Sequence, residues 1–223
     1  MCRLLLLSNP DGVDPEAHLH AFKKICETSQ EYQGHGWGCA WLDENDNWQF
    51  YHNILPLWED PAQHFPKTRL FMVHARSAFR DEGIAVENNM PFDDGDNVFL
   101  FNGELQGVQI KSQGRIGAEK IFNYIKRFDK GDIAQATRKG VDIINKRTRY
   151  IRAMNFFLAN RQAVQICSLF GEDPDYFALH TAFNNGLRII CSQPYPMVER
   201  WNTIENHRIL TLDCHTSELV PSA

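Results

Sequence analysis

Cys2 is the residue best placed to do chemistry, because removal of Met1 would leave a thiol and a free α-amino group on one residue. The thiolate is the reactive form of cysteine. An α-amino group titrates near ~7.7–8.0, so it can take the thiol proton at neutral pH without a histidine partner. The alternative is a structural cysteine at the start of a buried strand, since residues 4–7 are all leucine. A catalytic interpretation therefore needs support from residues elsewhere in the chain.

His74 and Arg76 follow an apolar run of strand length at residues 70–73. A side chain at the end of a buried strand can project into a cleft while the sheet holds it still. An arginine there offers a planar fork that fits a substrate carboxylate. The alternative is a surface ion pair between Arg76 and Asp81 or Glu82.

Asn102, Gly103 and Glu104 follow a second apolar run, at residues 98–101. A side-chain amide beside a glycine N–H gives two donors that can converge on one oxygen, as a tetrahedral oxyanion requires. Asn-Gly is also a frequent tight-turn dipeptide, so the pair equally indicates a turn. A turn and an oxyanion site can be the same object.

A glycine-spaced loop covers residues 34–38 and contains His35 and Trp37. Repeated glycines allow the backbone to approach a ligand closely, and Trp37 is a candidate for a pocket wall. The loop precedes a strand and not a helix, which excludes a dinucleotide-binding motif. We interpret His35 as a loop residue in preference to a ligand or a base.

The composition favours one large domain over residues 1–223, with 43% hydrophobic and 23% charged residues. A net charge of -5 provides no positive field for a polyphosphate backbone, so nucleic-acid binding is disfavoured. The basic stretch 139–152 is interrupted by apolar residues, and we interpret it as the solvated side of an amphipathic helix and its exit.

The six cysteines include no C-x-x-C pair, and no secretory signal precedes them. The apolar run at residues 4–7 is far shorter than the ~20 residues that span a membrane. We therefore expect a cytoplasmic protein with reduced cysteines and no membrane association. Neither the cysteines nor the nine histidines show the spacing of a zinc site, so no metal is expected.

Hydrophobic periodicity predicts clusters of strands separated by a pair of helices. A helix over 15–32 would present Leu19, Phe22 and Cys26 on one face. The two middle helices have apolar faces at Ile121, Phe122, Ile125 and Phe128, and at Ile133, Val141 and Ile144. The predicted strands are 2–7, 39–42, 48–51, 70–75, 98–101, 153–159, 163–169, 187–191 and 208–212. This order favours an α+β sandwich of antiparallel sheets over a doubly wound parallel sheet.

In their order along the chain, these segments resemble the class II glutamine amidotransferase domain of the N-terminal-nucleophile hydrolases, in its small stand-alone form. The resemblance covers most of the sequence. The matching segments are Met1-Cys2-Arg3-Leu4-Leu5, His74-Ala75-Arg76-Ser77-Ala78, Asn89-Met90-Pro91-Phe92, Phe101-Asn102-Gly103-Glu104-Leu105, residues 34–38 and Cys191-Ser192-Gln193-Pro194.

The resemblance implies a four-layer αββα sandwich, with two stacked antiparallel sheets between helical layers. It also implies that Cys2 becomes the nucleophile once Met1 is removed, and that Arg76 grips the α-carboxylate of glutamine. Asn102 and Gly103 would form the oxyanion site, and no cofactor is needed. The further candidates for substrate binding are His74, Ser77, Glu104, Glu119 and Trp37.

One segment departs from the family pattern. Relatives carry Ser/Thr-Asp-Ser/Thr-Glu, whose aspartate holds the substrate α-amino group, and the matching segment here is residues 116–119. Gly117 stands at the aspartate position, so we expect weaker binding of free glutamine unless Glu119, Glu104 or another acid substitutes. The alternative substrate is a γ-glutamyl compound, or another amide whose amino group is absent, blocked or recognised elsewhere. His35 also stands where relatives often show aspartate.

The sequence thus predicts hydrolysis of a small-molecule side-chain amide through a thioester, with release of ammonia. The ammonia either passes to a separate synthase subunit or is a by-product. Two other functions stay open. One is a catalytically silent binding or regulatory module with the same fold, favoured by Gly117, and the other is an N-terminal-nucleophile acylase for a non-glutamyl amide.

Overall fold

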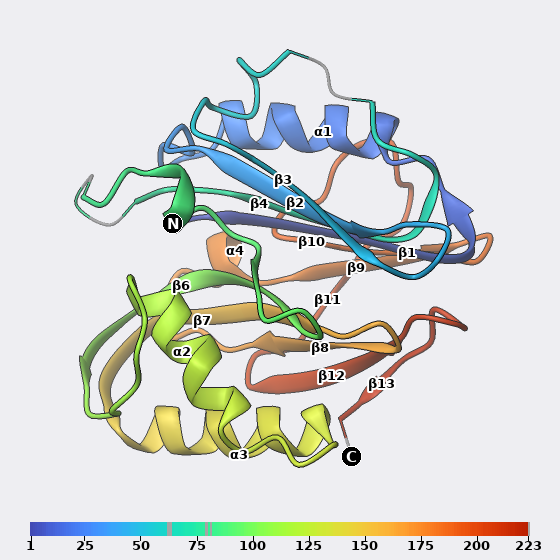
Figure 1. Ribbon diagram of the computed structural model, residues 1–223. Coiled ribbons are helices and arrows are strands. Elements are labelled where there is room, and N and C mark those ends of the chain that lie inside the picture. Colours follow the sequence, from blue (N-terminus) through green and yellow to red (C-terminus); the bar gives the residue numbers. More distant parts are fainter. Residues whose placement is uncertain (62–63, 79, 81, 223) are drawn as a thin grey trace.

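Two antiparallel sheets stack face to face, with helices on both outer sides (Figure 1). This computed structural model describes residues 1–61, 64–78, 80 and 82–222. The order of layers is helix, sheet, sheet, helix. The predicted α+β, four-layer αββα sandwich is therefore confirmed.

The first sheet has β1 at its centre, paired on both sides. Its strands, in order across the sheet, are β11 (Asn202–Thr203), β9 (His180–Asn184), β10 (Leu187–Cys191), β1 (Arg3–Val13), β4 (Thr68–Ala75), β2 (Trp37–Leu42) and β3 (Trp48–Asn53). Leu5 and Leu7 of β1 face the outer helix, whereas Leu4 and Leu6 face the second sheet. Burial on both faces explains why the strand reads as a continuous apolar run.

The second sheet is dominated by the long pair β6 and β7. Its strands, in order, are β13 (Leu219–Pro221), β12 (Arg208–Asp213), β8 (Ala163–Ser168), β7 (Thr148–Ala159), β6 (Val98–Val108) and β5 (Phe92–Asp93). The β6–β7 register shifts between Glu104 and Leu105. Val98 and Leu100 of β6 pack against the inner face of the first sheet.

Helices cover the outer faces. α1 (Glu16–Glu27) packs Leu19, Phe22 and Cys26 on the first sheet, as predicted. α2 (Gly117–Lys126) and α3 (Ile133–Lys146) cover the second sheet. α3 begins after Asp132, whose carboxylate accepts a hydrogen bond from the Gln135 N–H at 2.9 Å and so caps the helix. Short helices among the described residues include η2 (Val86–Asn88) and α4 (Pro174–Phe177).

Several boundaries differ from the predictions, and three of these differences concern the residues around the site. The first helix ends at Glu27, not near residue 32. Trp37 belongs to β2 and not to the preceding loop. Asn102 and Gly103 lie inside β6, opposite Asn155 and Met154 of β7, so the turn predicted there is wrong. The local preference of Asn-Gly for turns is outweighed by pairing along the full length of β7.

The six cysteines are all buried and unpaired. Among the residues that the structure describes, no helix is long and apolar enough to cross a membrane.

Candidate active site

Three strands bring the predicted residues to one end of the space between the sheets. Leu4 pairs with His74 in the first sheet, so Cys2 lies beside the end of β4. His74 Nε2 lies 3.1 Å from the carbonyl oxygen of Phe101 in the second sheet. Since this carbonyl belongs to the residue before Asn102, the His74 hydrogen bond links the strand beside Cys2 to the strand that carries Asn102.

The thiol of Cys2 contacts the backbone of Ser77. The Ser77 N–H points at Sγ with an N···S distance of 3.4 Å, and Sγ lies 3.6 Å from the Ser77 carbonyl oxygen. Burial raises the pKa of Cys2, although the chain amine, the Ser77 N–H and the Arg76 charge act in the opposite direction. With Met1 attached, the thiol is therefore protonated at neutral pH.

Arg76 follows β4 directly and is 5% exposed. Its guanidinium donates to Asn89 Oδ1 at 3.3 Å and to the Gly83 carbonyl at 2.9 Å. Among the described residues it pairs with no carboxylate, and it forms no ion pair with Glu82; Asp81 lies outside the described residues. A buried cation held in place by neutral oxygens is suited to an anionic ligand.

Asn102 is 1% exposed, and its side chain makes no hydrogen bond to any described residue. Its Oδ1 atom is fully buried without a partner. Buried side-chain polar atoms are normally satisfied, and an unsatisfied one occurs at a strained or catalytic position or where water or an ion completes it. The orphan Oδ1 is an acceptor and cannot bind an oxyanion; that role would use the Nδ2 donors, which make no hydrogen bond to the described residues.

The Gly103 N–H faces away from β7. Its partner Met154 donates its own N–H to Leu169, on the β8 side, so this pair is not hydrogen-bonded across β6 and β7. Phe101 lies two residues before Gly103 on β6, so the N–H groups of both residues point to the same side of the strand. The Phe101 N–H points away from β7, to Met90 Sδ at 3.2 Å. A Cβ on Gly103 would lie 2.2 Å from the Ala153 carbonyl oxygen, so only glycine fits.

His74 is fully buried and neutral. Burial, together with the Arg76 charge, lowers the pKa of His74 to about 3. Its Nε2 donates to the Phe101 carbonyl, which leaves Nδ1 as an unprotonated and unpartnered acceptor. His74 is therefore a positioning residue that holds two strands together, and not an acid or a base.

The loop at residues 34–38 supports the Arg76 segment. The Ala78 N–H donates to His35 Nδ1 at 2.8 Å, and the His35 N–H donates to the Arg76 carbonyl at 3.1 Å. Trp37, predicted to wall a pocket, is instead 1% exposed and donates to the buried Asp60 at 2.8 Å. The alternation of β2 turns its ring toward the α1 side, where it joins the outer core.

Met1 is held by contacts that the sequence did not indicate. Its ammonium pairs with Glu31, and its carbonyl oxygen accepts hydrogen bonds from Gln33 Nε2 at 2.6 Å and from the Tyr176 hydroxyl at 3.2 Å. The side chain packs with Ala153, Phe170, Tyr176, Phe177 and Ala178. These residues come from distant segments and carry no motif, so no pattern in the sequence could have found them.

Glu104 and Glu119, the predicted substitutes for the missing aspartate, both have protein partners. Glu104 accepts from Gln106 at 2.7 Å and lies 3.8 Å from the Arg152 guanidinium. Glu119 accepts several hydrogen bonds from Arg115, and this interaction lowers the pKa of Glu119. Neither carboxylate is free to bind an ammonium without displacing a partner.

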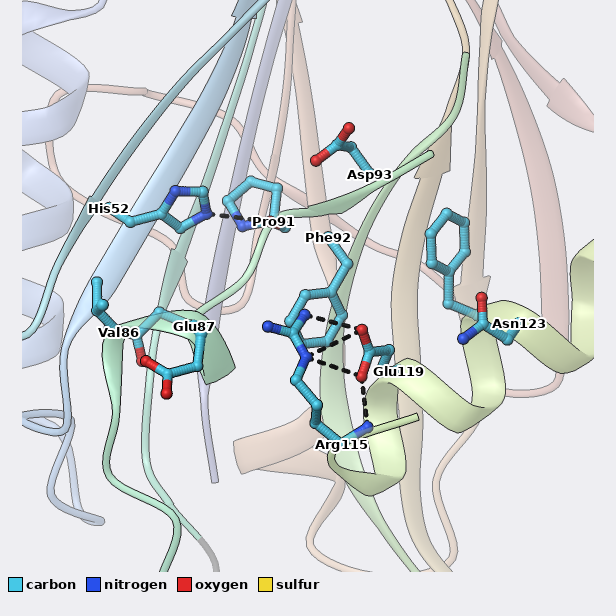
Figure 2. A pocket seen from close by; sticks show the side chains of 11 residues that line it. His52, Val86, Glu87, Pro91, Phe92, Asp93, Arg115, Glu119 and Asn123 are labelled. Carbon is cyan, nitrogen blue, oxygen red and sulfur yellow. Dashed lines mark hydrogen bonds and ion pairs between the residues drawn. The ribbon is translucent and has the colours of Figure 1, made fainter. Parts of the chain in front are cut away.

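A cavity of about 320 Å³ extends from Asn89 to the first turn of α2 (Figure 2). The Arg115–Glu119 pair lines one side of it, and His52 and Pro91 line another. Asn89 also binds Arg76, so the cavity adjoins the guanidinium without containing Cys2 or Asn102. Gly117 is exposed at the start of α2, and a Cβ there would meet no atom within 4 Å.

No group of three or more His, Cys, Asp and Glu side chains that could hold a metal occurs among the described residues. The functional groups brought to this end of the sheets are the Cys2 thiol, the Arg76 guanidinium and the N–H groups of Asn102 and Gly103.

Solved structures with this arrangement of sheets decide the fold family. The chain matches a glutamine aminotransferase class-II domain protein from Silicibacter pomeroyi over 100% of both chains, with a TM-score of 0.63 at 15% identity. It matches the glutamine phosphoribosylpyrophosphate amidotransferase of B. subtilis with a TM-score of 0.65 at 13% identity, over 100% of this chain and 49% of that one. The fold is that of class II glutamine amidotransferase domains.

A third structure with the class II amidotransferase fold is named as a predicted glutamine amidotransferase from Pseudomonas aeruginosa. It matches with a TM-score of 0.57 at 14% identity, over 97% of this chain and 94% of that chain. The chain spans about half the length of the B. subtilis amidotransferase, so only that part of the larger protein is comparable. No protein-family model and no curated protein matches the sequence.

Proposed function

We propose that the chain, once Met1 is removed, is a cysteine-dependent amidohydrolase that cleaves the side-chain amide of glutamine or of a γ-glutamyl compound. The observation that carries this proposal is the convergence on the end of β4. Cys2 Sγ contacts the backbone of Ser77, next to Arg76, while His74 binds the carbonyl that precedes Asn102. The segments that carry the candidate nucleophile, the candidate anchor and the candidate oxyanion donors meet at this strand end, which supports the proposal.

The reaction begins with the free α-amino group of Cys2, which takes the thiol proton through a bridging water. The thiolate attacks the amide carbon, and the oxyanion accepts hydrogen bonds from Asn102 Nδ2 and the Gly103 N–H. The protonated amine then gives its proton to the departing nitrogen as the C–N bond breaks. Water cleaves the remaining thioester, and the thiol proton returns.

Arg76 supplies the ground-state anchor. The α-carboxylate of a glutamyl group would take the place facing the guanidinium, where the partners among the described residues are the neutral oxygens of Asn89 and Gly83. Gly117 offers no carboxylate, and Glu119 and Glu104 are already paired. This favours a γ-glutamyl amide whose amino group is recognised weakly or not at all.

A labelling experiment tests the proposal. Intact mass spectrometry first establishes that Met1 is absent, and 6-diazo-5-oxo-norleucine is then added. We expect one equivalent of label on Cys2, loss of labelling in Cys2→Ala, and ammonia release from at least one γ-glutamyl amide. Cys167→Ala is the matched control, because Cys167 is buried in β8 and burial raises its pKa.

The silent module is the alternative that Gly117 favours. In that case the processed chain would take up no label and release no ammonia. Labelling by other acyl electrophiles alone would indicate an acylase for a non-glutamyl amide. Full amidase activity in Cys2→Ala would exclude the thioester mechanism itself.

A further inference from the structure

Met1 occupies a built site. Its carbonyl oxygen accepts from Gln33 Nε2 and the Tyr176 hydroxyl, and its ammonium pairs with Glu31. Its side chain is 9% exposed within an apolar group on β7, α4 and their neighbours. The ammonium, the carbonyl oxygen and the side chain of Met1 therefore each have partners in the folded chain.

The site lies on the side from which a leaving group must depart. Met1 is bonded to the Cys2 nitrogen, and in the proposed mechanism that nitrogen gives its proton to the departing nitrogen of the substrate. A substituent on the departing nitrogen must then extend away from Cys2. The volume that Met1 fills is the volume that becomes accessible there when Met1 is removed.

We propose that the Met1 site is the leaving-group subsite of the mature enzyme. Its substrates are γ-glutamyl amides whose nitrogen carries an apolar arm of about methionine size together with a neutral carbonyl oxygen. This inference rests on the proposed function and specifies its substrate class. The arm packs on Phe170 and Phe177, and the oxygen accepts from Gln33 and Tyr176.

The polar atoms of the site support an uncharged or cationic group and oppose a carboxylate. Glu31 loses the Met1 ammonium on processing and keeps the guanidinium of Arg152, at 3.0 Å, as its cationic partner among the described residues. Arg152 is itself shared with Glu172 and, at 3.8 Å, with Glu104 and Asp173. The surroundings are thus negative, and a free carboxylate on the leaving group would meet Glu31.

Gln33 supplies a second, independent observation. It is fully buried, and its Oε1 atom has no hydrogen-bond partner. Its Nε2 atom already lies at the Met1 carbonyl, so the amide group is at the subsite. A leaving group with an N–H donor would satisfy this buried oxygen and also fill the apolar part of the site. Glutamine cannot do both, because its leaving group is ammonia.

The hydrolysis is balanced without any further reactant. The thiolate forms the thioester as the C–N bond breaks, and the departing amine takes its proton from the Cys2 ammonium. Water supplies the oxygen and the hydrogen that complete glutamate and restore the thiol.

The test compares kcat/KM for four amides with the processed chain: glutamine, N-γ-butylglutamine, γ-glutamylmethionine and γ-glutamylmethioninamide. We expect γ-glutamylmethioninamide to exceed glutamine at least about tenfold. Butylglutamine should lie between them, and γ-glutamylmethionine should lie below the methioninamide derivative because of Glu31. Intact mass spectrometry checks removal of Met1 in every preparation.

Two variants locate the effect. Tyr176→Phe removes one donor and Ala178→Leu fills the apolar part, so each should lower the ratio of kcat/KM for γ-glutamylmethioninamide to that for glutamine. Tyr124→Phe is the matched control, because Tyr124 is buried in the α2 side of the core and its hydroxyl makes no hydrogen bond to the described residues.

The outcomes separate the two proposals. Glutamine hydrolysis that equals or exceeds hydrolysis of all three substituted amides overturns the leaving-group subsite and leaves the amidohydrolase assignment standing. An unchanged ratio in both Tyr176→Phe and Ala178→Leu also overturns the subsite. No hydrolysis of any of the four amides by processed, Cys2-containing protein overturns both.

Discussion

Asn102 and Asn155 face each other across β6 and β7, but their side chains differ in hydrogen bonding. The Asn155 amide donates to the Phe177 carbonyl at 2.6 Å and accepts from the Leu169 N–H at 3.0 Å. The Asn102 Oδ1 atom, equally buried, has no partner. One asparagine holds the fold together, while the other keeps a buried oxygen without a partner among the described residues.

Replacement of Asn102 by leucine should separate activity from stability. We expect kcat to fall about 10²–10³-fold, as for loss of one oxyanion donor. The free energy of unfolding should stay the same or rise, because an unsatisfied buried oxygen is removed. Urea denaturation and steady-state kinetics on the same preparation provide the two measurements.

Asn155→Leu is the matched control at the opposite position. It leaves a buried carbonyl and a buried N–H without partners, so it should destabilise the fold by about 1–3 kcal/mol for each group. Equal destabilisation by both substitutions would contradict the distinction drawn between the two asparagines.

Arg76→Ala should affect substrate binding more than the chemical step. Charge-assisted hydrogen bonds contribute about 1.5–3 kcal/mol, so KM for a γ-glutamyl amide should rise about 10–100-fold with a smaller change in kcat. Arg208→Ala, which removes an exposed partner of Glu205, is the control and should leave both constants unchanged. A KM that does not change in Arg76→Ala would exclude Arg76 as the carboxylate anchor.

His74 makes the stability of the fold depend on pH. Its pKa is about 3 in the folded chain and near ~6.5 when unfolded, so the unfolded chain binds more protons between these values. Stability is then complete above pH ~6.5 and falls on acidification by up to ~1.4 kcal/mol per pH unit. His74→Gln keeps a donor for the Phe101 carbonyl and should reduce this loss. Urea titrations at pH 7 and pH 5 measure it, and an equal loss in both proteins would refute the assignment.

Gly117→Asp should restore an amino-group ligand. The exposed start of α2 has room for the side chain and favours a negative charge through the helix dipole. The cavity beside it reaches Asn89, which binds Arg76. We expect KM for free glutamine to fall about tenfold relative to Gly117→Ala, which controls for the gain in helix propensity. Identical KM values in the two variants would show that this position does not face the substrate.

The strands and the helix around the site could be predicted where the hydrophobic pattern within one segment determines the element. The apolar runs of β1 and β4 are buried on both faces, and α1 shows the expected face of Leu19 and Phe22. The end of β4 before Arg76 was correctly placed for the same reason.

What the sequence could not show depends on contacts between distant segments. Asn102 and Gly103 continue a strand because β7 pairs with them, which no local preference reveals. Trp37 is the first residue of β2, two residues before the predicted start of that strand, so its ring lies on the same side of the sheet as Cys39. The partners of Met1 at residues 31, 33 and 176 are brought together only by the folded chain.

The position of β1 in the middle of its sheet has a dynamic consequence. Chain ends usually fray, and their amide protons exchange quickly with solvent. Here β1 is flanked by β4 and β10 up to Ser8, so we expect the amides of residues 4–8 to exchange only when the sheet opens. We therefore expect the segment that carries Cys2 to be as rigid as a core strand, without any crosslink to hold it in place.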